Sequence, residues 1–144
     1  MADIFSKKKR SQIMATIASK ETKPEIAVRS FLFSNGFRFR KNLKTLQGTP
    51  DIVLPKYKFV ILVHGCFWHG HKNCGKSTLP TSNTIFWKEK IQSNVARDKK
   101  AKLALQKSGW TVFIIWECEL KNRISFNRTM KKLLKKLDSQ SKLV

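Results

Sequence analysis

The feature that most restricts the fold of this chain is a loop rich in histidine and cysteine that directly follows an apolar run. The run covers residues 58–63, and its uninterrupted apolar character is typical of a strand buried on both faces. All three histidines and two of the three cysteines fall in the next segment, residues 64–74. Functional side chains often lie in loops at strand ends, because the sheet holds such loops in place. We therefore expect a site at the end of this strand.

Two further segments place this strand in a sheet. Residues 111–116 form a second buried strand, rich in β-branched and aromatic residues, and a long helix over about 85–107 separates the two strands. A strand, a helix and a strand of these lengths predict a crossover in which the strands are parallel and end at the same edge. Residues 51–54 form a shorter apolar strand, and the tight connection at 55–56 predicts an antiparallel hairpin with 58–63.

The remaining elements complete an α/β fold, a small mixed β-sheet flanked by helices. Thr22 and Glu25 read as a capping box for a helix that ends at Asn35-Gly36. We expect that helix to pack through Ile26, Phe31 and Leu32, and residues 37–40 to form a half-exposed strand. The last helix, 126–138 with Ser125 as its N-cap, is apolar on one side at Phe126, Met130, Leu133, Leu134 and Leu137. The chain is expected to be one domain over 1–144, with a basic helical arm at 1–20 (helix 5–18) and a loose tail at 139–144.

The charge of the chain indicates a polyanionic partner. The 30 lysines and arginines exceed the 9 acids, which gives a net charge of +21 and a pI near 10.4. Such a positive field favours nucleic acid. No segment approaches the roughly 18 apolar residues of a membrane span, and the N-terminus does not resemble a signal peptide. Three cysteines, an odd number, argue against a disulfide framework and for the reducing cytoplasm.

The cysteines predict a structural zinc site. Cys66 follows one predicted parallel strand and Cys118 follows the other, so their thiols should emerge side by side. Cys74 and one histidine can fold back to complete a tetrahedral Cys₃His set, which is a closed zinc arrangement. Spacing leaves His69 and His71 open as the fourth ligand. The alternative is three buried cysteines that act as small hydrophobic residues.

An aromatic pair, Phe67-Trp68, lies in the middle of this polar loop. Both rings can simply pack over the zinc site. They can also form a wedge that enters a DNA base stack, where aromatic rings replace the lost stacking. Trp87, near the start of the long helix, can join them.

Asp51, at the start of the short strand, is a candidate carboxylate ligand for a metal ion. A lone aspartate after a proline is commonly a cap or turn residue, but His64 and His69 are predicted at the end of the neighbouring strand. A carboxylate together with a main-chain carbonyl makes an oxygen site for Mg²⁺, and a bound metal activates water and polarises phosphate. A neutral histidine nearby can accept the proton. This combination predicts metal-assisted phosphodiester hydrolysis.

With these residues in view, the sequence resembles the very short patch repair (Vsr) endonucleases over about residues 7–120. The resemblance lies in the following strings: Thr49-Pro-Asp-Ile-Val53, Val63-His-Gly-Cys-Phe-Trp-His-Gly-His71, Phe86-Trp-Lys-Glu-Lys-Ile91, Asn94-Val-Ala-Arg-Asp98, Gly109-Trp-Thr-Val112 and Ile115-Trp-Glu-Cys-Glu-Leu120. The string His-Gly-Cys-Phe-Trp-His is highly specific.

The resemblance implies a function. Such enzymes nick DNA on the 5′ side of the thymine in a T·G mismatch, which arises when 5-methylcytosine deaminates within a methyltransferase site. It also implies a fold like that of type II restriction endonucleases and Mg²⁺-dependent hydrolysis. The implied partners are mismatched double-stranded DNA, a functionally linked cytosine-C5 methyltransferase and mismatch-repair factors. The expected setting is a prokaryotic nucleoid, with the chain a monomer.

The resemblance also implies residue roles. Asp51 would bind Mg²⁺ with the main-chain carbonyl of Val63, where the family usually has threonine. His69 would be the base, with Glu25 beside it and His64 in the same site. The implied zinc ligands are Cys66, His71, Cys74 and Cys118. The implied DNA contacts are Phe67, Trp68 and Trp87 in the base stack, Met14 opposite them, and Lys90 and Asn94 at the mismatched pair.

Two other functions compete with this one. A non-catalytic, zinc-stapled DNA-binding module would keep the cysteines and basic helices, but it has no use for Asp51 and His69 together. An endonuclease of the same fold that cuts matched duplex sites would have no need of an aromatic wedge, because intercalation is costly and most useful at a weak pair.

Overall fold

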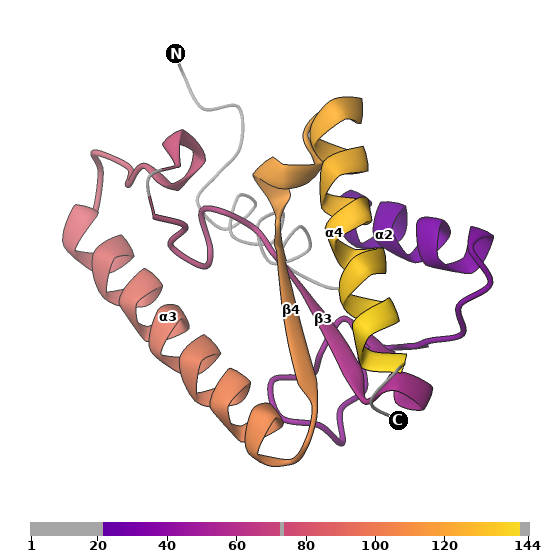
Figure 1. Ribbon diagram of the computed structural model, residues 1–144. Helices are drawn as coiled ribbons and strands as arrows, with labels where there is room; N and C mark the ends of the chain where they lie inside the picture. Colours follow the sequence, from indigo (N-terminus) through magenta and orange to yellow (C-terminus); the bar gives the residue numbers. More distant parts are fainter. Residues whose placement is uncertain (1–21, 73, 142–144) are drawn as a thin grey trace.

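The computed structural model describes residues 22–72 and 74–141, which form a mixed four-stranded sheet with helices on both faces (Figure 1). The strands lie in the order β1 (Arg40–Lys41), β2 (Ile52–Leu54), β3 (Phe59–His64) and β4 (Thr111–Trp116). The helices are α2 (Lys23–Ser34), α3 (Thr84–Lys107) and α4 (Arg123–Ser141). The predicted α/β class, with a small mixed sheet flanked by helices, is confirmed. Its likeness to restriction endonucleases stays a prediction.

The pairing of the strands follows the sequence pattern. Strands β2 and β3 are antiparallel, with Ile52 opposite Ile61, and the short helix Pro55–Tyr57 connects them. Lys58 closes this connection in the left-handed region at φ 51°. Strands β3 and β4 are parallel over their whole length, from Phe59 opposite Thr111 to His64 opposite Trp116. The predicted hairpin and crossover are therefore both confirmed.

The two faces of the sheet are covered by different helices. Helices α2 and α4 bury Val28, Leu32, Met130, Leu133 and Leu137 against β2, β3 and β4, which forms the larger core. Helix α3 covers the opposite face, where its Leu105 packs with Val53 and Val60. Figure 1 shows α3 on one side of the two long strands and α4 on the other. Because side chains alternate between faces along a strand, each residue of β3 faces either α3 or the pair α2 and α4.

The structure corrects three details near the N-terminal side of the sheet. Thr22 makes no side-chain capping bond, so the predicted capping box is wrong. Glu25 is instead buried, at 5% exposure. Ile26 is 46% exposed, and the residue buried in its place is Val28. The inner position predicted for Ile26 is therefore wrong. The predicted strand at 37–40 is reduced to β1, because Phe37 and Phe39 pack against the larger core outside the ladder.

Helix α4 is longer than predicted at both ends. It begins at Arg123, and Asn122 rather than Ser125 caps it: Asn122 Oδ1 accepts from the Ser125 N–H at 2.8 Å. At the other end, residues 139–141 belong to the helix, although we predicted them in a loose tail. No glycine or proline stands there to end it. The predicted helix at 5–18 and Met14 lie outside the described residues, as do residues 142–144.

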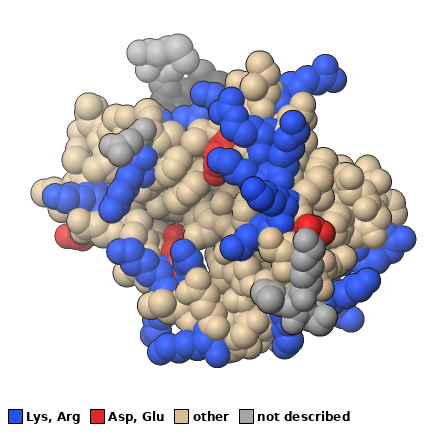
Figure 2. Space-filling view, in the orientation of Figure 1, with Lys and Arg blue, Asp and Glu red and all other residues tan. Residues whose placement is uncertain are grey.

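Basic side chains are prominent on the surface of the molecule. Figure 2 shows lysines and arginines spread over one face, with few acidic groups between them. Within residues 22–72 and 74–141, no helix has the length and hydropathy needed to cross a membrane.

Candidate active site and metal cluster

The functional side chains converge because β3 and β4 end together. His64 and Trp116 are the last paired residues of the two strands. Cys66 and Cys118 each follow two residues later, so parallel pairing brings both thiols out at the same edge. The polar loop that begins at Gly65 then folds back over this edge.

Four ligand-type side chains meet there and form what we term the Cys₃His cluster: Cys66, His71, Cys74 and Cys118. Their sulfur and nitrogen atoms all lie within 4.8 Å of one another, and Cys118 Sγ lies 3.5 Å from His71 Nδ1. Three thiols and one imidazole are a donor set suited to tetrahedral Zn²⁺. Of the two histidines that spacing left open, the structure brings His71 to the thiols.

Hydrogen bonds within the loop bring the cluster together. The His71 N–H donates to the Cys66 carbonyl at 2.9 Å, which reverses the chain. The Ser77 hydroxyl lies 2.6 Å from the His71 carbonyl and 2.8 Å from that of Cys74, and so holds the far side of the loop. Gly70, at φ +59°, lies so close to α3 that a Cβ there would come within 2.8 Å of Ile91. Only glycine fits this approach without strain.

The thiols of the cluster are in different environments. Burial raises the pKa of Cys66 to about 12, so without a metal this thiol is neutral. The backbone N–H of Lys76 lowers the pKa of Cys74 by stabilising its thiolate. Zinc binding deprotonates its thiol ligands. The four donors therefore suit a zinc ion, because its positive charge would stabilise the Cys66 thiolate that burial otherwise disfavours.

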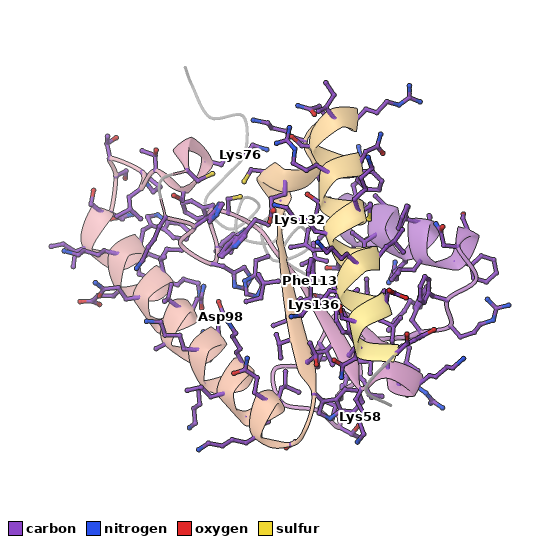
Figure 3. The ribbon with its side chains drawn as sticks, viewed as in Figure 1. Lys58, Lys76, Asp98, Phe113, Lys132 and Lys136 are labelled. Carbon is purple, nitrogen blue, oxygen red and sulfur yellow. The ribbon has the colours of Figure 1, made fainter. Side chains whose placement is uncertain are left out.

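A second group of side chains lies beside the first, on the α3 face of the sheet. His69 Nδ1 is 2.6 Å from Asp98 Oδ2, and its ring stacks on that of His64 with centroids 3.9 Å apart and planes 7° from parallel. Asp98 comes from α3, on the side that faces the strands (Figure 3). We call Asp51, His64, His69 and Asp98, which are candidates for catalysis, the catalytic centre.

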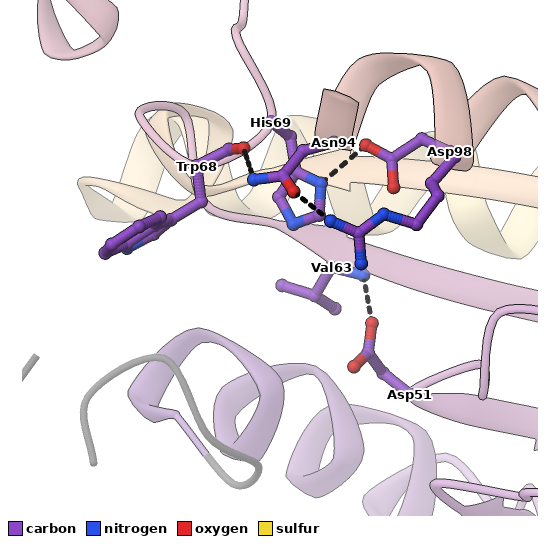
Figure 4. Close-up of polar contacts among 7 residues, drawn as sticks. Asp51, Val63, Trp68, His69, Asn94 and Asp98 are labelled. Carbon is purple, nitrogen blue, oxygen red and sulfur yellow. Dashed lines mark hydrogen bonds and ion pairs between the residues drawn. The ribbon is translucent and has the colours of Figure 1, made fainter. Parts of the chain in front are cut away.

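Sequence reasoning did not assign a role to Asp98. A signal for it is the spacing between Asn94 and Asp98, one turn apart on the same face of α3. Asn94 Nδ2 donates to the Trp68 carbonyl at 2.9 Å, and Asp98 binds the next residue of the loop, His69. Figure 4 shows these two contacts side by side. Successive turns of α3 thus hold successive loop residues.

Asp51 lies at the start of β2, across from the end of β3. The Val63 N–H donates to Asp51 Oδ2 at 2.7 Å (Figure 4). The pKa of Asp51 is raised to about 6, chiefly because the carboxyl is desolvated by burial; the Val63 N–H opposes this rise, and the charge of Glu25 adds to it. In a strand the N–H and carbonyl of a residue point to the same side, so the Val63 carbonyl also faces Asp51. Two oxygens of the kind Mg²⁺ prefers are therefore neighbours.

His64 is held neutral. It is buried at 6% exposure, and its Nδ1 has no hydrogen-bond partner among the described residues. The pKa of His64 is lowered to about 4, chiefly by burial and also by the charge of the stacked His69, while Asp98 partly opposes both. Of the two stacked imidazoles, His69 is the one that contacts the Asp98 carboxylate.

Trp116 lies between the two groups. Its ring stacks on His71 of the Cys₃His cluster, with centroids 4.0 Å apart and planes 8° from parallel. Its edge meets His64 of the catalytic centre, with centroids 5.1 Å apart. The structure thus packs a candidate metal ligand and a candidate catalytic residue on one indole.

Three aromatic side chains, which we call the wedge, form a cluster at the start of α3. Phe67, Trp68 and Trp87 contact one another edge to face, with centroid separations of 5.2, 5.4 and 5.8 Å. All three are half-buried, so part of each ring faces solvent. Lys90 is exposed one turn further along α3, while Asn94 is engaged with the Trp68 carbonyl and with Arg97.

Comparisons with known proteins match the sequence of this chain to a family. The family of the DNA mismatch endonuclease Vsr matches residues 2–76. The type II nicking enzyme V.NmeAIP of Neisseria meningitidis serogroup A is 53% identical over 137 residues, which cover 95% of this chain and 97% of the relative. The type II nicking enzyme V.XorIIP of Xanthomonas oryzae is 45% identical, over 93% and 98%. The DNA mismatch endonuclease Vsr of Escherichia coli K12 is 44% identical, over 85% and 78%.

Proposed function

This chain belongs to the Vsr family of DNA mismatch endonucleases, and we propose that it nicks duplex DNA on the 5′ side of the thymine in T·G mismatches. That it is a DNA endonuclease follows from the family. The proposal adds the mismatch, the position of the nick and the dependence on Mg²⁺. The mismatches would be those left by deamination of 5-methylcytosine, which links the chain to a cytosine-C5 methyltransferase and to mismatch-repair factors.

One observation carries the proposal: a half-buried carboxylate and a histidine–aspartate pair face the same strand end. Asp51 contacts the Val63 N–H, and His69 contacts Asp98. A module that only binds DNA has no use for this arrangement. Hydrolysis would need both groups, since Asp51 would hold a metal and the His69–Asp98 pair would move a proton.

Asp51 and the Val63 carbonyl would hold Mg²⁺, with the buried Glu25 adding negative charge close by. When bound, this ion activates water and stabilises charge on the scissile phosphate. Burial is the main reason that the pKa of Asp51 is raised, and the negative charge of Glu25 adds to the rise. A divalent cation relieves the repulsion between the two acids.

His69 would act as the general base. Its Nδ1 is taken by Asp98, so Nε2 is the nitrogen that can accept a proton from water. Asp98 fixes this tautomer and stabilises the imidazolium that results, which is the role of an aspartate beside a catalytic histidine. The neutral His64 stacks on the ring and keeps its plane fixed. It also keeps water from one face of His69.

The wedge supplies a physical basis for mismatch preference. Phe67, Trp68 and Trp87 would enter the base stack from one groove, opposite Met14, which lies outside the described residues. Opening a stack costs least at a weak pair, so an inserted aromatic cluster favours mismatched sites. Lys90 and Asn94 would contact the mismatched pair, and Asn94 would then exchange its bond to the Trp68 carbonyl for one to a base.

The decisive experiment is single-turnover nicking with Mg²⁺ on duplexes that differ only in one pair, T·G or T·A, placed in several methyltransferase contexts. We expect a nick 5′ of the mismatched thymine in at least one context. Equal cleavage of T·A duplexes would favour the matched-site endonuclease instead. Asp51→Asn should bind the T·G duplex and leave it uncut. If it cuts at the wild-type rate, this site does not perform the reaction.

The wedge is tested by Trp68→Ala, with Phe33→Ala as the control at a 64% exposed aromatic on α2, a helix outside the wedge. Stacking contributes about 1–3 kcal/mol per base. Trp68→Ala should therefore reduce the ratio of T·G to T·A affinity by roughly tenfold, while the control leaves the ratio unchanged. Equal loss of affinity for both duplexes would show that the ring only packs within the protein.

A further inference from the structure

Helix α4 carries a row of basic side chains on the face turned away from the core. The row, which we call the α4 stripe, consists of Arg128, Lys131, Lys132, Lys135 and Lys136, all exposed. Steps of three and four residues keep such positions on one side of a helix. Figure 2 shows basic side chains gathered over α4, and Figure 3 shows Lys132 and Lys136 on the same side of it.

The composition of the stripe separates it from an ordinary solvated face. Exposed helices usually interleave acids with bases, because opposite charges three or four residues apart stabilise the helix and like charges destabilise it. In α4 the one acid is Asp138, beyond the stripe. The repulsion within a row of like charges is relieved when a polyanion lies along it.

The stripe and the catalytic centre lie on different faces of the sheet. Met130, Leu133 and Leu137 bury the opposite side of α4 against the core shared with α2. Asp98 and the histidines lie on the α3 face. A duplex is stiff over the size of a small protein, with a persistence length of about 150 base pairs. A straight segment bound on the α3 face is therefore separated from the outer side of α4 by the sheet and the larger core.

We propose that the α4 stripe is a second DNA-binding surface, which holds the phosphate backbone of a duplex segment other than the one in the catalytic centre. The stripe spans about 12 Å along the helix, a length over which one strand presents about three or four phosphates. It would keep the enzyme on long DNA while mismatches pass through the catalytic centre. This inference rests on the proposed function for its duplex substrate.

The test removes three charges from the stripe in the full-length protein, as Lys131→Gln, Lys132→Gln and Lys135→Gln. Glutamine keeps a good helix former at each position and leaves the core side of α4 untouched. Thermal melting followed by circular dichroism checks that the fold is kept.

The matched control removes the same charge elsewhere, as Lys44→Gln, Lys56→Gln and Lys107→Gln. These lysines are exposed and lie on other elements: a loop, the connection between β2 and β3, and the end of α3. Both triple variants have the same net charge. A difference between them therefore reports the position of the charge and not its amount.

Binding to a long matched duplex is measured against salt. Each phosphate contact contributes about 0.9 to the slope of log affinity against log salt, so the stripe variant should lose about 2 to 3 from the slope and the control less than 1. Single-turnover nicking of a T·G duplex of about 16 base pairs should be unchanged in both. The salt dependence of binding is measured without cleavage, so it tests the stripe independently of the nicking reaction. Nicking by the wild-type protein separately shows whether it prefers T·G duplexes.

Three outcomes would overturn the inference. Equal loss of slope in the two variants would mean that only net charge matters. An unchanged slope in the stripe variant would mean that the row serves another partner, such as an acidic polypeptide. Slower nicking of the short duplex by the stripe variant alone would place α4 on the segment in the catalytic centre.

Discussion

The Cys₃His cluster and the catalytic centre both begin where β3 and β4 end, but they offer opposite kinds of ligand. The cluster presents three thiols and one imidazole within 4.8 Å of one another. The catalytic centre presents carboxylates, a main-chain carbonyl and imidazoles. Soft sulfur ligands suit a closed zinc site, whereas oxygen ligands suit Mg²⁺ that keeps open positions for water and phosphate.

One short loop, which follows β3, supplies a histidine to each of the two groups. His69 and His71 are two positions apart, and the turns at Gly65–His71 send them in different directions. His69 reaches Asp98 on α3, while His71 returns to Cys118 after β4. Two neighbouring imidazoles thereby belong to two different groups of side chains, and Trp116 packs against both groups.

The sharpest test of the comparison is loss of the cluster. Structural zinc contributes about 10 kcal/mol or more to small folds, so Cys118→Ser should release zinc and unfold much of the chain. Elemental analysis should find about one zinc per wild-type chain, and circular dichroism should show the variant unfolded. A wild-type protein that is folded and free of zinc would contradict the assignment.

The next test removes each of the two histidines in turn and compares the effects. His69→Ala removes the proton acceptor, and general acid–base help is commonly worth about 10²–10⁴ in rate. The variant should stay folded, retain zinc and lose nicking by that order. His71→Ala should lose zinc first. The measurements are single-turnover nicking of a T·G duplex and zinc content in each variant, and zinc missing from His69→Ala would reverse the two roles.

Asp98→Asn gives a smaller effect and isolates the orientation of His69. The amide can still occupy the position, but it cannot stabilise an imidazolium. Changes to residues that orient a functional side chain typically cost about 10–100-fold in activity. We expect that loss in the nicking rate with zinc content and T·G affinity unchanged. A wild-type rate would show that the 2.6 Å contact does not assist His69.

The smallest effect is on stability without magnesium. Burial raises the pKa of Asp51 to about 6 in the folded chain, against 3.8 as its ordinary value. The folded protein therefore favours the protonated acid, and this contribution is complete below about pH 4 and lost as pH rises through 6. Asp51→Asn, which is never ionised, should be more stable than wild type by about 1–3 kcal/mol above pH 6.

The same difference should vanish near pH 4, where the wild-type carboxyl is protonated as well. Denaturant unfolding of both proteins at several pH values measures it. Added Mg²⁺ should stabilise wild type and leave the variant unchanged. A gap that is constant from pH 4 to pH 8 would show that ionisation of Asp51 is not its cause.

Much of the fold was predictable because periodicity and chain length specify local structure. The apolar runs at 58–63 and 111–116, with a helix between them, already required parallel strands that end together. That alone brought Cys66 and Cys118 to one edge. The errors were local: Glu25 is buried beside the catalytic centre instead of closing a capping box, and Asn122 rather than Ser125 caps α4.

The sequence by itself determined which residues are available and at which strand end they gather, since strand register and crossover direction follow from pattern and length. Spacing alone left His69 and His71 open as the fourth ligand, the family resemblance implied His71, and the tertiary structure brings His71 to the thiols. Only the tertiary structure brought Asp98 to His69 and Trp116 between the two groups. The His69–Asp98 contact joins residues 29 positions apart, and the His71–Cys118 contact joins residues 47 positions apart. Helix and strand periods describe neighbours along the chain, so they carry no information about which turn of α3 packs against which residue of the loop.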